Sequence, residues 1–317
     1  MSVHLTCCSH SPLMLTGIEE TQGDAQARFR AAMDDVAREL DAFAPDLVLS
    51  FGPDHFNGFF YDLMPPFCIG VVAEGLRDWG MRGGALRVPK TLALDCVREL
   101  HRRDFDISIS YDMKIDHGAT VSLTQLTGAL DRFPVLPVFI NCAADPRPSL
   151  RRVRALGTAI GEFLATRDLR VAVIGSGGLS HDPPTPRLDR APPEVAARLI
   201  KRAIPGADDL AAREARVLRA ARDLVAGKGP CMPPDPQWDA AFMRKIEAFD
   251  ADALDRIDDA ELDRQAGFGG HEVRTWVAAS AAAHALAGPA GRLTPRERFC
   301  QVIPEWLTGM GVMTAAA

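Results

Sequence analysis

Short, continuous apolar runs recur along the N-terminal part of the chain. Each has the length of a β-strand and is too uniformly apolar for a strand with one face in water, so we expect strands buried on both faces. These runs cover residues 3–8, 47–51, 67–72, 135–140 and 169–174. Residues 105–111 alternate apolar and polar side chains, which predicts one more strand. Pro137 lies inside the fourth run and indicates an edge strand or a bulge, because proline cannot donate to a ladder.

Between these runs, apolar side chains recur at every third or fourth position, the spacing of an amphipathic helix. Residues 24–43 show the pattern most clearly, and Pro45 ends it. The same spacing predicts helices over 92–100, 150–163 and 273–286, with another after Gly118. The chain therefore opens as strand, helix, strand and continues in alternation, which indicates the α/β fold class.

The composition changes after His181, where proline-rich stretches separate short helical patterns. We expect residues 183–266 to form a mostly helical wall or lid on a single α/β domain spanning residues 1–317. The apolar segment 301–306 is expected either to pack back on this domain or to meet a neighbouring copy. We also predict a homo-oligomer, and an Ala-rich tail that frays.

Four of the eight histidines share one kind of position, just after a predicted strand. They are His10, His55, His117 and His181. In an α/β sheet, ligands bind in the loops beyond the carboxyl ends of the strands. A histidine there can ligate a metal or carry a proton, although a single one is more often an ordinary polar contact. Four at corresponding places indicate one shared site.

The loop before His181, Gly175-Ser176-Gly177-Gly178, invites comparison with three known motifs and matches none. No Lys-Ser/Thr pair follows it, as a phosphate-binding P-loop requires, and Ser180 stands where a dinucleotide motif has its third glycine. Neither serine has glycine two residues away on both sides, which disfavours serine hydrolysis. We expect the glycines to let the backbone approach a ligand and to leave His181 room to turn inward.

Composition excludes several classes of function. The net charge of −6 and the lack of a Lys/Arg block argue against nucleic-acid binding. No apolar run approaches the roughly 20 residues of a membrane span, and residues 1–12 lack the features of a signal peptide. The seven cysteines form no CxxC pair, as is typical of reduced thiols, so we expect a cytoplasmic protein.

A carboxylate completes the candidate chemistry. After the break at 267–270, His271 and Glu272 open the predicted helix. Two histidines and one carboxylate around an open coordination face are typical of non-haem Fe(II) oxygen chemistry. Zinc hydrolases use a similar set with water in the open position. No short motif such as HExxH joins these ligands, so the residues alone leave iron and zinc open, and Glu272 also suits the helix dipole.

Several longer runs resemble the class III extradiol ring-cleavage dioxygenases. The similarity extends over nearly the whole chain and is weakest over 183–230 and after Gly309. The runs that carry it are Ser9-His10-Ser11-Pro12, Pro53-Asp54-His55, 57–62, 64–68, Asp116-His117-Gly118, 134–141, 175–181 and 275–279. The resemblance implies a central mixed β-sheet with helices on both faces.

The resemblance also implies roles for individual residues. His10, His55 and Glu272 would hold Fe(2+), His181 would act as the catalytic base, and His117 as the proton donor. Glu261 and His271 lie nearby in the sequence and are alternative candidates for the ligand role given to Glu272.

The reaction implied by the resemblance is cleavage of a catechol by O2. The implied substrate is 3-(2,3-dihydroxyphenyl)propionate, together with 2,3-dihydroxycinnamate, and the product is a 2-hydroxy-6-oxonona-2,4-dienedioate. A cation should meet the substrate carboxylate; Arg187, Arg244 and Arg274 are candidates and none is favoured. Two alternatives stay open: a non-enzymatic, Memo-like binding protein on the same fold, against which the four histidines argue, and a zinc-dependent hydrolase.

Overall fold

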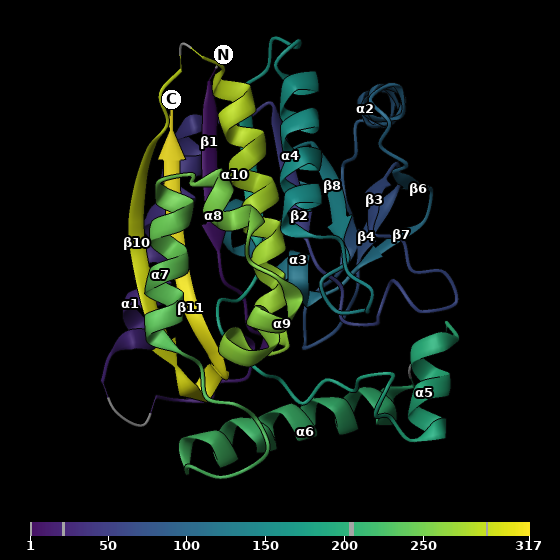
Figure 1. Ribbon diagram of the computed structural model, residues 1–317, viewed down its shortest axis with the longest axis vertical. Coiled ribbons are helices and arrows are strands. Elements are labelled where there is room, and N and C mark those ends of the chain that lie inside the picture. Colours follow the sequence, from purple (N-terminus) through teal and green to yellow (C-terminus); the bar gives the residue numbers. More distant parts are fainter. Residues whose placement is uncertain (1, 21–22, 203–205, 290) are drawn as a thin grey trace.

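The centre of the protein is an eight-stranded sheet (Figure 1), seen in a computed structural model that describes residues 2–20, 23–202, 206–289 and 291–317. Across the sheet the strands are β10 (Thr294–Ile303), β11 (Thr308–Ala316), β1 (Val3–Cys8), β9 (Val171–Ser176), β2 (Leu47–Gly52), β8 (Val135–Ile140), β3 (Phe67–Gly70) and β6 (Ser108–Ser110). A smaller sheet contains β5 (Gly84–Ala85), β4 (Ala73–Gly75) and β7 (Met113–Ile115).

The large sheet is mixed. Its middle strands β1, β9, β2 and β8 run parallel, while β11 joins β1, and β3 joins β8, in antiparallel pairs. All residues of the four middle strands are buried, which agrees with their continuous apolar sequences. The predicted fold class, a mixed sheet between helices, is confirmed.

Helices cover both faces of this sheet. In chain order, the helices of the described residues are α1 (Ala25–Phe43), α2 (Lys90–Arg102), α3 (His117–Thr127), α4 (Leu150–Leu164), α5 (Pro193–Ile200), α6 (Ala207–Val225), α7 (Pro236–Glu247), α8 (Ala251–Asp255), α9 (Asp259–Glu261) and α10 (Val273–Ala287). Short helical turns are η1 (Pro12–Leu15), η2 (Leu262–Ala266), η3 (Gly269–Glu272) and η4 (Pro304–Trp306). One apolar core packs α2, α4, α7 and α10 on the sheet, and a second packs α1, α3 and α6 on the opposite face.

Local sequence explains where key helices begin. Asp116 caps α3 by accepting a hydrogen bond from the Gly118 N–H (2.9 Å). Asp235 caps α7 in the same way, with Pro236 in its first turn. The Ala-rich α10 lies side by side with α4 (Figure 1), and Gly157 permits this close approach because a Cβ there would lie 2.2 Å from the Ala278 carbonyl oxygen.

Helices α5 and α6 extend across the lower end of the sheet in Figure 1, where β1 ends. They belong to the segment predicted to be helical, 183–266, and that segment contains α5 to α9 among the described residues. Within it, α6 contributes Ala220 and Ala221 to the core. This arrangement places helices opposite the loops that follow the parallel strands.

Two details of the strand predictions were wrong. The strand expected over 105–111 is only β6, because Ile107 N–H donates to the Phe105 carbonyl in a turn instead of extending the ladder. Pro137 does not mark an edge or a bulge, since β8 lies between β2 and β3 and pairs with β2 in an unbroken register. The ladder with β3 involves only 138–140, so it ends before the proline.

The C-terminal prediction also needs correction. The tail expected to fray forms β11, whose residues Thr308 to Ala315 are buried between β10 and β1. Its small side chains fit a strand that is covered on both faces. The apolar segment 301–306 packs back on the domain, with Trp306 fully buried.

Candidate metal centre and active site

One cavity collects all five residues that the sequence singled out. His10, His55, His117, His181 and Glu272 line a space of about 220 Å³. His10, His55 and His181 follow the parallel strands β1, β2 and β9, while His117 follows β7 and begins α3. Glu272 comes from η3, directly before α10. Parallel strands end at one edge of a sheet, which explains why the three histidines after β1, β2 and β9 meet.

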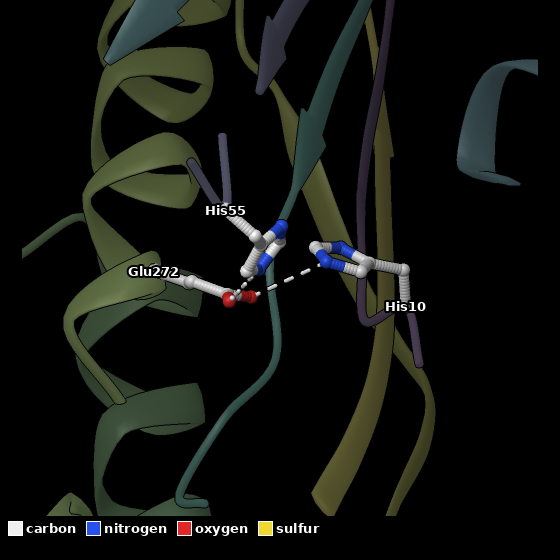
Figure 2. A group of neighbouring side chains, drawn as sticks. All are labelled: His10, His55 and Glu272. Carbon is white, nitrogen blue, oxygen red and sulfur yellow. Dashed lines mark hydrogen bonds and ion pairs between the residues drawn. The ribbon is translucent and has the colours of Figure 1, made fainter. Parts of the chain in front are cut away.

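His10, His55 and Glu272 point toward one another from three separate elements (Figure 2). Their potential ligand atoms all lie within 4.8 Å of one another. Nε2 of His55 is 3.0 Å from Oε1 of Glu272, and Nε2 of His10 is 3.6 Å from Oε2. The carboxylate thus lies within reach of both imidazoles.

Hydrogen bonds behind these histidines fix their orientation. The Ser176 hydroxyl donates to the Gly118 carbonyl (2.6 Å), so its oxygen accepts from Nδ1–H of His10 (3.1 Å). Asp116 accepts from Nδ1–H of His55 (3.1 Å). Both imidazoles therefore turn Nε2 toward Glu272, just as metal-bound histidines are commonly oriented by a hydrogen bond from their other ring nitrogen.

The charges in this trio suit a cation. Burial lowers the pKa of His10 to about 3, so this histidine is neutral and can act as a ligand. Burial alone would raise the pKa of Glu272, but His10 and His181 outweigh it and hold that pKa well below its usual value. Burial alone would lower the pKa of His55, but the Asp116 and Glu272 carboxylates outweigh it and raise that pKa well above its usual value.

This geometry fits a metal ion. Two imidazoles and an ionised carboxylate form the donor set of open-faced iron and zinc sites. A second group, His55, Asp116 and His117, also brings potential ligand atoms within 4.8 Å. In that group, however, Asp116 is already occupied by the His55 imidazole and by the Asn57 amide (2.8 Å).

His181 lies beside the trio, with Nε2 3.5 Å from Oε1 of Glu272. Its Nδ1–H donates to the Leu179 carbonyl (2.8 Å), which leaves Nε2 as the proton-accepting atom of the neutral ring. A Cβ at Gly178 or Gly269 would lie 2.6 Å or 2.2 Å from ring atoms of His181. The expectation that glycines leave this ring room is confirmed, with the added contribution of Gly269.

His117 also lies beside the trio. Its ring stacks on that of His55, with centroids 4.4 Å apart and an interplanar angle of 14°. Its Nδ1 is hydrogen-bonded to Oδ2 of Asp78, which leaves Nε2 free to carry a proton. The site therefore offers two proton carriers beside one candidate metal position.

Three supporting residues escaped sequence reasoning. Asp116 could have been identified from the sequence, because it precedes His117 and occupies a helix N-cap position. Ser176 lies in the glycine-rich loop, where its role depends on a contact with His10 across the sheet. Asp78 lies in an irregular loop and nothing in the local sequence distinguished it.

The competing residues lie away from the cavity. His271 is buried against Asp263 (3.1 Å) and Arg274 (2.7 Å), and Glu261 belongs to α9; neither lines the cavity. None of the three arginines considered for the substrate carboxylate lines it either. Arg274 is fully buried and pairs with Asp259, and Arg187 pairs with Asp182 (3.6 Å).

Comparisons with known proteins identify the family of the chain. Residues 4–310 match the family described as the catalytic LigB subunit of aromatic ring-opening dioxygenase. A 2,3-dihydroxyphenylpropionate/2,3-dihydroxicinnamic acid 1,2-dioxygenase from Paraburkholderia xenovorans (strain LB400) is 46% identical over 99% of this chain and 98% of its own. A protein of the same name from Mycolicibacterium gilvum (strain PYR-GCK) is 44% identical over 99% and 98%.

One solved structure supports the fold alone. The uncharacterized protein JW3007 from Escherichia coli K12 aligns with a TM-score of 0.51 and 13% identity, covering 98% of each chain. Among the helices that the structure describes, none has the length and hydropathy of a membrane span.

The family match decides between the classes of function left open by the sequence. It supports a dioxygenase over a Memo-like binding protein and over a zinc hydrolase. Enzymes of this class use a metal cofactor, a catechol-type aromatic substrate and O2, and the His/His/Glu trio offers a place for the metal. The chain belongs to the LigB family of aromatic ring-opening dioxygenases.

Proposed function

We propose that this protein cleaves 3-(2,3-dihydroxyphenyl)propionate and 2,3-dihydroxycinnamate beside their hydroxyl groups with O2, using Fe(II) held by His10, His55 and Glu272. The product is the corresponding 2-hydroxy-6-oxonona-2,4-dienedioate-type acid. The main support is the convergence of these donor atoms within 4.8 Å inside a cavity. Relatives that are more than 40% identical over nearly the whole chain carry this activity in their names.

When bound, Fe(II) supplies a site where both catechol oxygens and O2 can meet and where a catechol hydroxyl becomes more acidic. His181 is proposed as the base that takes the hydroxyl proton at Nε2. Burial lowers the pKa of His181, but Glu272 reverses this and raises it. Once the Glu272 carboxylate acts as a ligand, it supports protonated His181 less, which favours the neutral ring that a base requires.

His117 is proposed as the proton donor for the later bond-breaking step. Asp78 holds Nδ1–H of this ring, so the transferable proton is carried at Nε2. Its stacking on His55 keeps the ring beside the reacting groups. An acid and a base on separate rings allow one proton to be taken and another given without a change of geometry.

We propose that residues 1–317 form a single catalytic domain, in which the segment 183–266 walls the cavity through α5 and α6. Pro183, Leu199, Leu210 and Val217 of that segment line the cavity and support this role.

A cytoplasmic homo-oligomer is the proposed working form. The cysteines are all free, and apolar side chains such as Ile109 and Tyr111 are exposed at and beside the edge strand β6. Light scattering coupled to size-exclusion chromatography tests the oligomer; a monomer at micromolar concentration would contradict it.

The test of the function is anaerobic loading with Fe(II), followed by addition of substrate and air. We expect O2 consumption and a yellow ring-fission product, and a parallel Zn(II)-loaded sample should give neither. A loaded protein that consumes no O2 with any of several catechols refutes the proposal. Turnover by the Zn(II) sample alone, on an ester or amide, would restore the hydrolase.

A further inference from the structure

We propose that Arg213 of α6 binds the carboxylate of the substrate side chain. The inference rests on the proposed function and names a subsite that the sequence left open. It implies that the segment 183–266 makes the enzyme select catechols with an acidic side chain over uncharged ones.

The arginines that line the cavity come from one segment of the chain. Among the described residues that line it, the basic side chains other than histidine are Arg198, Arg213 and Arg216, and all three come from α5 and α6. The candidate metal ligands come from other parts of the cavity wall, with His10 and His55 after strands β1 and β2 and Glu272 in η3. A substrate with a diol at one end and a carboxylate at the other matches this division.

Arg213 differs from its neighbours in having an inward position and no neutralising partner. It is half-buried, and Nη1 donates to Oδ1 of Asn57 (3.2 Å). It makes no ion pair within 4.0 Å with any described residue, whereas Arg198 is paired with Asp209 (3.2 Å). Arg216 also lacks such a pair but is exposed.

The local charges favour an anion beside Arg213. Burial and the adjacent Arg216 lower the pKa of its guanidinium, and Asp209 opposes them. The guanidinium nevertheless stays protonated, so a partly desolvated positive charge faces the cavity. Glu214 also lines the cavity, but successive residues on a helix do not face each other, so it does not neutralise Arg213. An arriving carboxylate would.

A chain of hydrogen bonds joins Arg213 to the candidate metal ligand His55. Arg213 contacts Asn57, Asn57 contacts Asp116, and Asp116 contacts Nδ1 of His55. These contacts place the guanidinium no more than roughly 11 Å from that nitrogen. A three-carbon side chain carries its carboxylate roughly 6 Å beyond the nearer ring oxygen at ordinary bond lengths. A cavity of about 220 Å³ exceeds the roughly 150 Å³ that admits benzene, which leaves room for the chain.

Paired substrates test the inference. Arg213→Met is assayed against 3-(2,3-dihydroxyphenyl)propionate and against 3-propylcatechol, which lacks the carboxylate. We expect KM for the acid to rise roughly 10- to 100-fold, as for loss of a charge-assisted pair, with propylcatechol kinetics unchanged. Arg213→Lys should recover part of the loss. Arg219→Met, on the same helix but away from the cavity, is the matched control and should behave like wild type.

A binding measurement on metal-free protein gives an independent readout. By calorimetry, 3-phenylpropionate should bind to wild type and to Arg219→Met but not to Arg213→Met. Equal losses on both catechols, or no loss on either, overturn the assignment. A wild-type enzyme that cleaves both catechols with equal efficiency refutes the subsite while leaving the proposed function intact. A wild type that cleaves neither refutes both.

Discussion

The position of the His181 ring depends on Gly269, and Gly269→Ala tests the role of that ring without removing it. Gly269 lies in η3 and has no positive φ, so alanine meets no backbone penalty there. A Cβ would lie 2.2 Å from Cδ2 and Nε2 of His181. The Gly269 N–H donates to the His181 carbonyl (2.9 Å), which prevents the two backbones from moving apart. The ring itself must therefore yield.

The geometry sets the expected size of the effect. Ordinary carbon contacts begin near 3.5 Å, so the ring has to retreat by more than about 1 Å. Misplacement by about 1 Å can cost 10²-fold in rate, and a general base contributes roughly 10²- to 10⁴-fold. We therefore expect kcat to fall by about 10²-fold or more. Strain and a weakened bond to Leu179 should cost about 1–3 kcal/mol of folding stability.

The assay compares kcat, metal content and melting temperature of Gly269→Ala with those of Gly206→Ala. Among the described residues, no heavy atom other than those of its chain neighbours lies within 4 Å of a Cβ built at Gly206, and its φ is not positive, so it is a matched control. Loss of kcat with full metal content supports the reasoning. If Gly269→Ala turns over like the control at equal metal content, the ring is not the base.

Three further predictions concern the same region. His55→Ala should abolish metal binding, whereas His181→Ala should retain the metal and lose turnover; normal turnover by His181→Ala, measured as O2 uptake, would disprove its role. Ser176→Ala should weaken metal affinity about 10- to 100-fold in a calorimetric titration, because Nδ1–H of His10 loses its acceptor. Ser122→Ala, which removes only the neighbouring hydroxyl bonded to Ser176 (2.8 Å), is its control and should lose less. Burial raises the pKa of Asp239 to about 7, so the folded protein binds a proton that the unfolded chain releases near pH 4. Wild type should therefore lose up to a few kcal/mol of stability relative to Asp239→Asn between pH 4 and 7, with a constant difference above pH 7; parallel melting curves across that range would contradict this.

The strands and the four junction histidines were accessible from sequence because buried parallel strands are continuous apolar runs. His10, His55 and His181 follow such strands and lie at one edge for topological reasons, whereas His117 follows β7 of the smaller sheet; the cavity contains all four. The resemblance implied roles for five residues, of which Glu272 lies farthest along the chain from the others. The fold brings these residues together in one cavity. Those roles stay predictions until the variants are assayed.

Other features depend on contacts that no local pattern encodes. Asp78 reaches His117 from an irregular loop, and Arg213 reaches Asn57 from a helix more than a hundred residues away in sequence. The strands β10 and β11 were missed because their polar and small residues lack a continuous apolar run, and burial of β11 comes from its neighbours. The prediction of an edge or a bulge at Pro137 was wrong because a ladder can end before a proline inside a central strand.

The way β1 is held has a consequence for assembly of the protein. β1 pairs with residues 171–176 on one side and with residues 312–316 on the other. The first strand of the chain therefore pairs only with strands that come much later in the sequence. Such long-range pairing forms slowly, because the chain loses the entropy of closing a long loop before the strand contacts stabilise it. His10 comes directly after this strand, so the metal pocket cannot mature ahead of the completed sheet. A deletion that removes residues 308–315 would disturb the interior of the molecule rather than its periphery.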